Sequence, residues 1–226
     1  MTGLTATALA AATGGVAGVM LQRTLGRRGY RLPDERSLPR RSVVWVAPLT
    51  LVLSGLAWWS LAPGYPAIVP AVYVASTWGM VALAAIDLDV QRLPNALQLP
   101  AYPAVSVLLS GCSLASGDWS SLSRALAAGG ALFALFLCLA LVAPAGSMGF
   151  GDVKLAGLLG LLLGWLSWGH VIVATTATFL LGGVVAVALL MTGLAGRKNE
   201  FAYGPVMLAS AVGTIVCLRP LLAALA

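Results

Sequence analysis

Three aspartates stand at the ends of long apolar runs in this sequence. Asp87 and Asp89 follow the run at residues 81–86, and Asp152 precedes the run that begins at Leu155. Two carboxyl groups brought close together cannot both ionise cheaply; they share a proton, which leaves one as a general base and the other as a general acid. Such a pair activates water for attack on a peptide carbonyl without a metal or a covalent intermediate. The residue types therefore indicate aspartyl peptidase chemistry, with the two roles belonging to the pair as a unit.

The residues beside these aspartates favour a constrained site. Gly149 and Gly151 precede Asp152, and we expect them to permit positive φ angles and close approach of the backbone. Pro94 breaks the segment after Asp87 before the next helix resumes. A Gly-x-Gly-Asp tetrapeptide alone is better explained as a structural turn, so the inference depends on the two motifs together.

The other four acidic residues are interpreted as solvated loop charges. They are Asp34, Glu35, Asp118 and Glu200. The three cysteines stand singly inside apolar runs, with no CxxC pair. Neither a zinc site nor a disulfide framework is therefore indicated.

The composition puts the helices that carry the aspartates in a membrane. Of 226 residues, 60% are hydrophobic and 9% are charged, and the mean hydropathy is +0.95, which excludes an ordinary water-soluble fold. A membrane-spanning helix needs about 20 mainly apolar residues. Apolar runs and the breakers between them predict an all-α, polytopic membrane helix bundle with about eight transmembrane helices. We expect these helices at residues 3–21, 43–62, 67–86, 98–115, 122–142, 155–169, 171–192 and 205–224.

The basic residues predict the orientation, because Lys and Arg are retained on the cytoplasmic side of a membrane. With eight helices, eleven of the thirteen basic residues fall on one side, and the exceptions are Arg124 and Arg219. Asp87 and Asp152 are far apart in the sequence, yet both stand at cytoplasmic helix ends, where they can meet. Seven arginines lie at 22–42, and we interpret them as solvated loop charge or as an anchor for anionic lipid. The net charge of +6 is attributed to this topology, and no nucleic-acid partner is expected.

The two aspartate motifs together resemble those of the type IV prepilin peptidase family, the bacterial branch of the GxGD intramembrane aspartyl proteases. Residues 87–100, Asp-Leu-Asp-Val-Gln-Arg-Leu-Pro-Asn-Ala-Leu-Gln-Leu-Pro, resemble the first motif of the family. Residues 149–154, Gly-Phe-Gly-Asp-Val-Lys, resemble its GxGDxK motif. Residues 201–205, Phe-Ala-Tyr-Gly-Pro, are similar to the Phe-Gly-Pro that opens the last helix of the family, with Tyr203 in the place of Phe. The resemblance covers about residues 43–226.

The resemblance implies that Asp87 and Asp152 are the catalytic pair. The six-residue gap before Pro94 selects Asp87 for the first position and leaves Asp89 as a loop charge. Lys154 either biases the pair electrostatically or contacts the substrate, or it is an ordinary cytoplasmic loop lysine. No metal or other cofactor is implied. The other residues implied as supporting ones are Gly149, Gly151, Pro94 and Asn95.

The implied activity is removal of the short leader from prepilin or pseudopilin precursors at the cytoplasmic face of the inner membrane, for type IV pilus assembly or protein secretion. Many family members carry zinc-binding CxxC pairs between their first two helices, in a segment that accompanies methyl transfer, whereas residues 22–42 contain no Cys. We therefore expect a peptidase without N-methyltransferase activity. Residues 1–42 would form a first transmembrane helix and an Arg-rich loop, and residues 43–226 the peptidase membrane domain. The expected partners are these precursors and the lipid bilayer, and the oligomeric state is left open.

A small transporter or channel is the alternative, because paired membrane acids and Gly or Pro interruptions are equally natural there. That class predicts internal repetition. The motifs around Asp87 and Asp152 are not copies of one unit, and neither lies in the middle of an expected span. A non-enzymatic membrane scaffold leaves both motifs unexplained. The sequence therefore favours the peptidase.

Overall fold

Helices make up almost all of the chain that the structure describes. The computed structural model describes residues 3–142, 149–192 and 202–225. A 3₁₀ turn, η1 (Asp34–Ser37), lies in the connection from α1 to α2. The α-helices are α1 (Gly3–Gly26), α2 (Val46–Leu61), α3 (Ile68–Val90), α4 (Asn95–Ser116), α5 (Trp119–Val142), α6 (Phe150–Leu166), α7 (Trp168–Met191) and α8 (Gly204–Leu225).

Five of these helices, α1, α3, α4, α5 and α7, are long and apolar enough to cross a membrane. The helix α2 and the first part of α8 are shorter apolar helices. The prediction of an all-α, polytopic membrane bundle is therefore confirmed, and the chain is an integral membrane protein.

Three helices extend further toward the aspartates than predicted. The helix α3 continues to Val90 instead of ending at 86, and α4 and α6 begin at Asn95 and Phe150 instead of 98 and 155. The predicted spans stop at polar residues, whereas a helix inside a bundle accommodates polar side chains that bind neighbouring elements. As a result, Asp87 lies in the last turn of α3 and Asp152 in the first turn of α6.

The helix α6 is at the centre of the second half of the bundle. Every residue from Leu155 to Leu166 is buried, and the helix contacts α4, α5, α7 and α8. A helix that is apolar on all sides is expected where other helices enclose it. Because Asp152 lies in the first turn of this enclosed helix, the packing of four neighbours fixes its position.

Glycines bring two pairs of helices close together. A Cβ atom added at Gly160 of α6 would lie 2.6 Å from the carbonyl oxygen of Ala128 on α5. One added at Gly18 of α1 would lie 2.9 Å from the carbonyl oxygen of Ala47 on α2. Both distances are shorter than van der Waals contact, so these helices approach as they do because glycine stands there. In a bilayer, such close packing replaces the hydrophobic effect as the force between helices.

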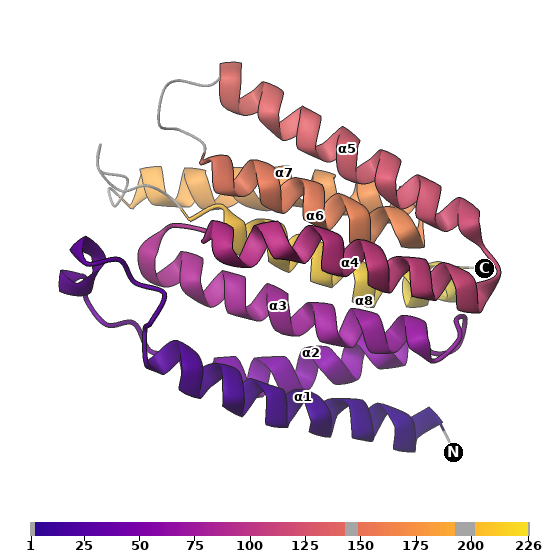
Figure 1. Ribbon diagram of the computed structural model, residues 1–226. Coiled ribbons are helices and arrows are strands. Elements are labelled where there is room, and N and C mark those ends of the chain that lie inside the picture. The colour runs from indigo at the N-terminus through magenta and orange to yellow at the C-terminus, as the bar shows by residue number, and fades with distance from the viewer. Residues whose placement is uncertain (1–2, 143–148, 193–201, 226) are drawn as a thin grey trace.

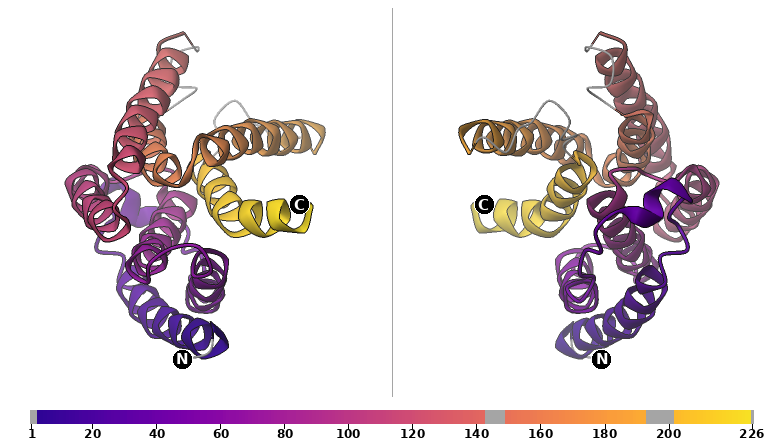
Figure 2. Two further views of the ribbon diagram at one scale, coloured as in Figure 1. Left: turned by 90° about the vertical axis from the view of Figure 1, so that its right-hand side faces the viewer. Right: turned by 90° about the vertical axis from the view of Figure 1, so that its left-hand side faces the viewer.

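One end of the bundle gathers the predicted site residues. At the left-hand end of Figure 1 are the α1–α2 connection, the α3–α4 turn and the first turns of α6 and α8, whereas the α2–α3 and α4–α5 turns lie at the other end. Arg92 and Lys154 thus share an end with the Arg-rich segment, as the predicted helix count requires, while Arg197 and Lys198 lie outside the described residues. Figure 2 shows the α1–α2 connection crossing this end of the bundle.

Candidate active site

Asp87 is a buried carboxyl group at the point where α3 meets α8. The residue is 4% exposed, and its Oδ2 atom has no hydrogen-bond partner among the described residues. The backbone N–H of Gly204, the first residue of α8, donates a hydrogen bond to the carboxyl group. The N-terminus of a helix favours an acidic group at this position. A Cβ atom added at Gly204 would lie 2.6 Å from Oδ2, so the close approach depends on glycine.

Asp152 is the third residue of α6, and the start of that helix orients its side chain. Its carboxyl group accepts a hydrogen bond from the backbone N–H of Gly149, the residue before the helix. An acidic residue at this position often reaches back in this way to the free N–H of the capping residue. The Asp152 carboxyl group is therefore held at the end of α6 that lies nearest Asp87.

Neither of the two glycines before Asp152 has a positive φ angle, and only Gly151 makes a close contact that depends on its small size. Gly149 has φ −78° and ψ 143°, and Gly117 is the one glycine with positive φ among the described residues. The expectation of positive φ angles in this motif is therefore wrong. Close backbone approach is confirmed at Gly151, where an added Cβ atom would lie 3.0 Å from the Cβ atom of Leu93.

The structure brings the two aspartate motifs together around Leu93. This side chain is 6% exposed and packs against both Gly151 and Gly204. Asp87 and Asp152 are close enough for their charges to interact. Within the described part of the chain, the salt bridges involve neither of them. Two acidic groups from motifs that are distant in the sequence thus lie near each other, and no salt bridge among the described residues neutralises either of them.

Tyr203 brings the third motif to the same place, while Phe201 lies outside the described residues. Its ring packs on Gly182 of α7, where an added Cβ atom would lie 2.7 Å from the ring carbon Cε2. Burial, and then the negative charge of Asp152, raise the pKa of the Tyr203 phenol. This residue therefore lies near Asp152 and directly precedes Gly204, which binds Asp87.

Three hydrogen bonds tie the first turns of α4 to the first turn of α6. Lys154 Nζ donates to Asn95 Oδ1 at 2.7 Å. Gln98 Nε2 donates to the carbonyl oxygen of Gly151 at 2.9 Å, and the Tyr102 hydroxyl donates to the carbonyl oxygen of Lys154 at 2.6 Å. Two residues that the resemblance implied separately, Lys154 and Asn95, therefore bind each other and join the two motifs.

Gln98 and Tyr102 are functional-site candidates that the sequence analysis missed. Their spacing gives a signal, because Asn95, Gln98 and Tyr102 lie three and four residues apart and so share one face of a helix. The motif at residues 87–100 alone does not single out either residue. Pro94 precedes α4 in an extended conformation, and its carbonyl oxygen accepts the N–H groups of Leu97 and Gln98, so the predicted break at Pro94 before the next helix is confirmed.

Asp89 is not a loop charge, which corrects the prediction. It lies in the last turn of α3, and its side chain is 2% exposed. Arg31 binds it through two atoms, with Nε 2.8 Å from Oδ2 and Nη2 2.7 Å from Oδ1. Arg28 Nη1 donates to Oδ1 at 3.1 Å, and the Tyr30 hydroxyl donates to Oδ2 at 2.7 Å. We call Arg28, Tyr30, Arg31 and Asp89 the Asp89 cluster.

The Asp89 cluster also folds the segment between α1 and α2. Arg31 donates to the carbonyl oxygens of Leu38 at 2.9 Å and Pro39 at 3.0 Å. Burial, and then the hydrogen bond to Asp89, raise the pKa of Tyr30 to about 12. The interpretation of the arginines as solvated or lipid-bound is therefore wrong for Arg31, which is buried, because a carboxylate inside the protein binds it.

The other acids interpreted as solvated charges differ among themselves. The prediction of a solvated charge is wrong for Glu35, because Arg92 Nε lies 2.7 Å from Glu35 Oε1 and the Glu35 side chain is 13% exposed. Asp34 is exposed, as expected. Asp118 accepts the backbone N–H groups of the next turn, at 3.0 and 3.2 Å, and so caps α5. Glu200 lies outside the described residues.

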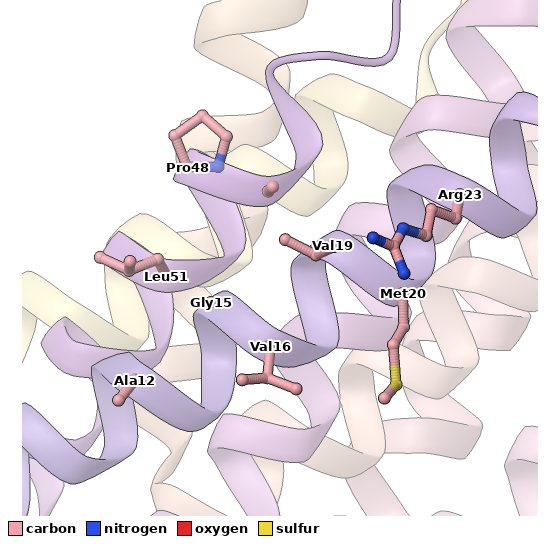
Figure 3. A pocket seen from close by; sticks show the side chains of 9 residues that line it. Ala12, Gly15, Val16, Val19, Met20, Arg23, Pro48 and Leu51 are labelled. Atoms are coloured by element: carbon pink, nitrogen blue, oxygen red, sulfur yellow. The ribbon is translucent and has the colours of Figure 1, made fainter.

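A cavity of about 540 Å³ between α1 and α2 is separate from this site. Figure 3 shows Val16 and Leu51 lining it, with Arg23 at one end. Neither aspartate motif contributes to its walls. The candidate active site is therefore the junction of α3, α6 and α8 and not this cavity.

Comparison with known families covers both aspartate motifs. A model of the type IV leader peptidase family matches residues 74–187, half of the chain. The chain belongs to the type IV leader peptidase family. Membership in the type IV leader peptidase family favours the peptidase interpretation over the transporter.

Curated relatives of this leader peptidase family member are named prepilin leader peptidase/N-methyltransferase. The Aeromonas hydrophila protein is 29% identical over 179 residues, which cover 79% of this chain and 57% of the relative. The Pseudomonas aeruginosa protein is 28% identical over 156 residues, which cover 69% of this chain and 51% of the relative. The chain thus spans about half the length of the curated relatives it matches. No solved structure matches the chain.

Proposed function

We propose that this leader peptidase family member removes the leader of prepilin or pseudopilin precursors, with Asp87 and Asp152 as its catalytic pair. One observation carries the proposal: two acidic groups from distant motifs lie close together without a cationic partner among the described residues. A structural acid in a protein interior needs a compensating charge, as Asp89 has. An uncompensated pair is instead suited to sharing and moving a proton.

The chemistry uses one shared proton. The unprotonated carboxylate takes a proton from water as the water oxygen bonds to the carbonyl carbon at the cleavage site. The protonated partner then gives its proton to the leaving amine as the carbon–nitrogen bond breaks, and the pair again holds one proton. Both roles belong to the pair as a unit. The N–H groups of Gly204 and Gly149 hold the two carboxyl groups in place.

The proposed site faces the cytoplasm at the inner membrane. The positive-inside rule supports this side, because eleven of the thirteen basic residues belong to it in the eight-helix topology. A precursor whose apolar segment spans the bilayer would present the bond before that segment at the level of Asp87 and Asp152. Residues 43–226 form the proposed peptidase domain, and the proposal concerns peptide cleavage alone and not methyl transfer.

Co-expression with a prepilin tests the proposal, with leader removal followed by gel shift and by the mass of the new amino terminus. Wild type is expected to cut the precursor, and Asp87→Asn and Asp152→Asn are expected to leave it intact at normal membrane levels. Asp34→Asn changes an exposed acid and is expected to cut like wild type. The proposal fails if wild type cuts no prepilin or if both site variants still cut.

A further inference from the structure

An apolar groove begins beside Asp87 and leads away from it between α2, α3 and α8. Its volume is about 440 Å³, within the range of roughly 300–1,000 Å³ found for ligand clefts. Leu88, next to Asp87, and Pro205, next to Gly204, line its near end. Among the described residues, its lining carries no charged side chain. The groove therefore ends at residues that adjoin Asp87 and Gly204 in the chain, and it is suited to an apolar occupant.

The dimensions of the groove fit a helix lying against α8. Its lining on α8 runs from Pro205 to Cys217, which corresponds to about 18 Å at the helical rise of about 1.5 Å per residue. Gly213 lines this wall, and a Cβ atom added there would have no neighbour within 4 Å. Small residues with open space beside them are where helices approach each other closely in membranes. Figure 2 shows α8 beside α2 and α3, with which it is in contact.

We propose that this groove holds the apolar segment of the substrate as a helix alongside α8, with the bond to be cut at Asp87 and Asp152. The inference rests on the proposed function, because a prepilin-type precursor is cut just before its apolar segment. An occupant of a groove whose near end is formed by the neighbours of Asp87 and Gly204 must be apolar from the first turns after the cut. The groove would thereby set which peptide bond reaches the pair.

A second apolar cavity, between α3, α4 and α6, is the competing position. It is smaller, at about 260 Å³, and its lining on α3 ends at Leu83, one helical turn before Asp87. Gly79 lines it, and a Cβ atom added there would also have no neighbour within 4 Å. The two cavities can therefore be filled separately by the same type of substitution.

Cross-linking tests the position directly, because the chain has a matched pair of exposed cysteines. Cys217 lines the groove, whereas Cys138 lies on α5 outside it. The probe is a prepilin precursor with one cysteine, held uncut by the Asp152→Asn variant and treated with a short bismaleimide. Cys217 lies between three and four helical turns beyond Gly204, which binds Asp87. A precursor cysteine at the same number of turns after the cleavage site is therefore expected to cross-link, and one in the first turn after the site is not.

The controls separate the groove from the rest of the lipid-facing surface. Cross-linking is expected to vanish in Cys217→Ser and to persist in Cys138→Ser. Cross-linking through Cys138, or equal cross-linking from every precursor position, would overturn the proposal, because the precursor would then lie elsewhere or move freely in lipid. Absence of any cross-link to Cys217 while wild type still cuts the same precursor would also overturn it.

Filling the groove gives a second test. Gly213→Leu is expected to raise KM for the full precursor about tenfold or more, with kcat for a short peptide that lacks the apolar segment unchanged. Gly130→Leu makes the same change at an open position on α5 and is expected to behave like wild type. Normal cleavage by Gly213→Leu, or impairment by Gly79→Leu alone, would overturn the groove assignment. Failure of wild type to cut any precursor would instead overturn the proposed function and the groove with it.

Discussion

Asp87 and Asp89 lie two residues apart on α3 and have opposite surroundings. Positions i and i+2 of a helix are about 200° apart around its axis, so one acid faces α8 and α6 and the other faces the segment between α1 and α2. Asp89 binds two arginines and a tyrosine. Asp87 receives the N–H of Gly204 and lies close enough to the acid Asp152 for their charges to interact.

The difference separates two uses of an acidic residue in a membrane protein. A carboxylate bound by arginines through two atoms is a fixed anion, and it holds two segments together. A carboxyl group opposite another one is stable only with a shared proton, so its protonation state can change during a reaction. The same turn of α3 therefore anchors the Arg-rich segment on one side and presents the proposed catalytic group on the other.

The largest expected effect concerns the coupling of Asp87 and Asp152. Each single change to Asn is expected to lower the rate of leader removal by a factor of about 10² to 10⁴, the range for loss of acid–base catalysis. The double variant is expected to be no slower than the slower single variant, because the pair acts as a unit. Initial rates with purified enzyme measure this. If the two losses multiplied instead, the acids would act independently and the shared-proton mechanism would be wrong.

For thermal stability, Asp89 is expected to matter more than Asp87. Asp89→Asn leaves Arg31 without its buried partner, and loss of one partner of a buried ion pair costs roughly 3–5 kcal/mol, so a marked drop in thermal stability is expected. Asp87→Asn removes no salt bridge among the described residues and is expected to melt like wild type. Thermal unfolding in detergent compares the two. Equal melting of Asp89→Asn and wild type would contradict the anchoring role of the Asp89 cluster.

The sequence predicted the helices and the pair of acids for a physical reason. Charges are costly inside apolar runs, so seven acids in 226 residues reduce to few candidates, and eight apolar runs identify eight helices. The extended helix ends were missed, because a polar residue marks the end of a span only if nothing inside the protein binds it.

The partners of Asp89 could not be predicted from the sequence. Arg31 is 58 residues away from it in the chain and is one of seven arginines in its segment. Composition gives no way to choose among them, since the choice depends on how the segment folds over the end of α3. Gln98 could have been found, because it shares a helix face with Asn95 and Tyr102.

A smaller effect is expected from Gln98, which connects α4 to the motif of Asp152. Gln98→Leu removes the donor to the carbonyl oxygen of Gly151, and loss of one hydrogen bond costs about 0.5–1.5 kcal/mol. The Oε1 atom of Gln98 already lacks a partner among the described residues, so the net loss of stability is expected at the low end of that range. We expect kcat to fall about tenfold with KM unchanged. Gln22→Leu on α1 is the matched control, and equal kcat values for the two variants would show that this contact does not position Asp152.

The smallest effect is expected at the outer edge of the Arg-rich segment, where Glu35 binds Arg92. The hydrogen bond from Arg92 is the main cause that lowers the pKa of Glu35 in the folded protein. A lowered pKa means that the pair stabilises the fold fully above the unfolded pKa of about 4.3 and loses this contribution as pH falls through the folded value. Glu35→Gln is therefore expected to cost less than about 1 kcal/mol near neutral pH, as for partly exposed pairs. The difference in melting temperature from wild type should shrink as pH falls from about 6 to below 4. Asp34→Asn alters the neighbouring exposed acid, and a difference as large there as at Glu35 would assign the effect to general charge in the segment and not to the pair with Arg92.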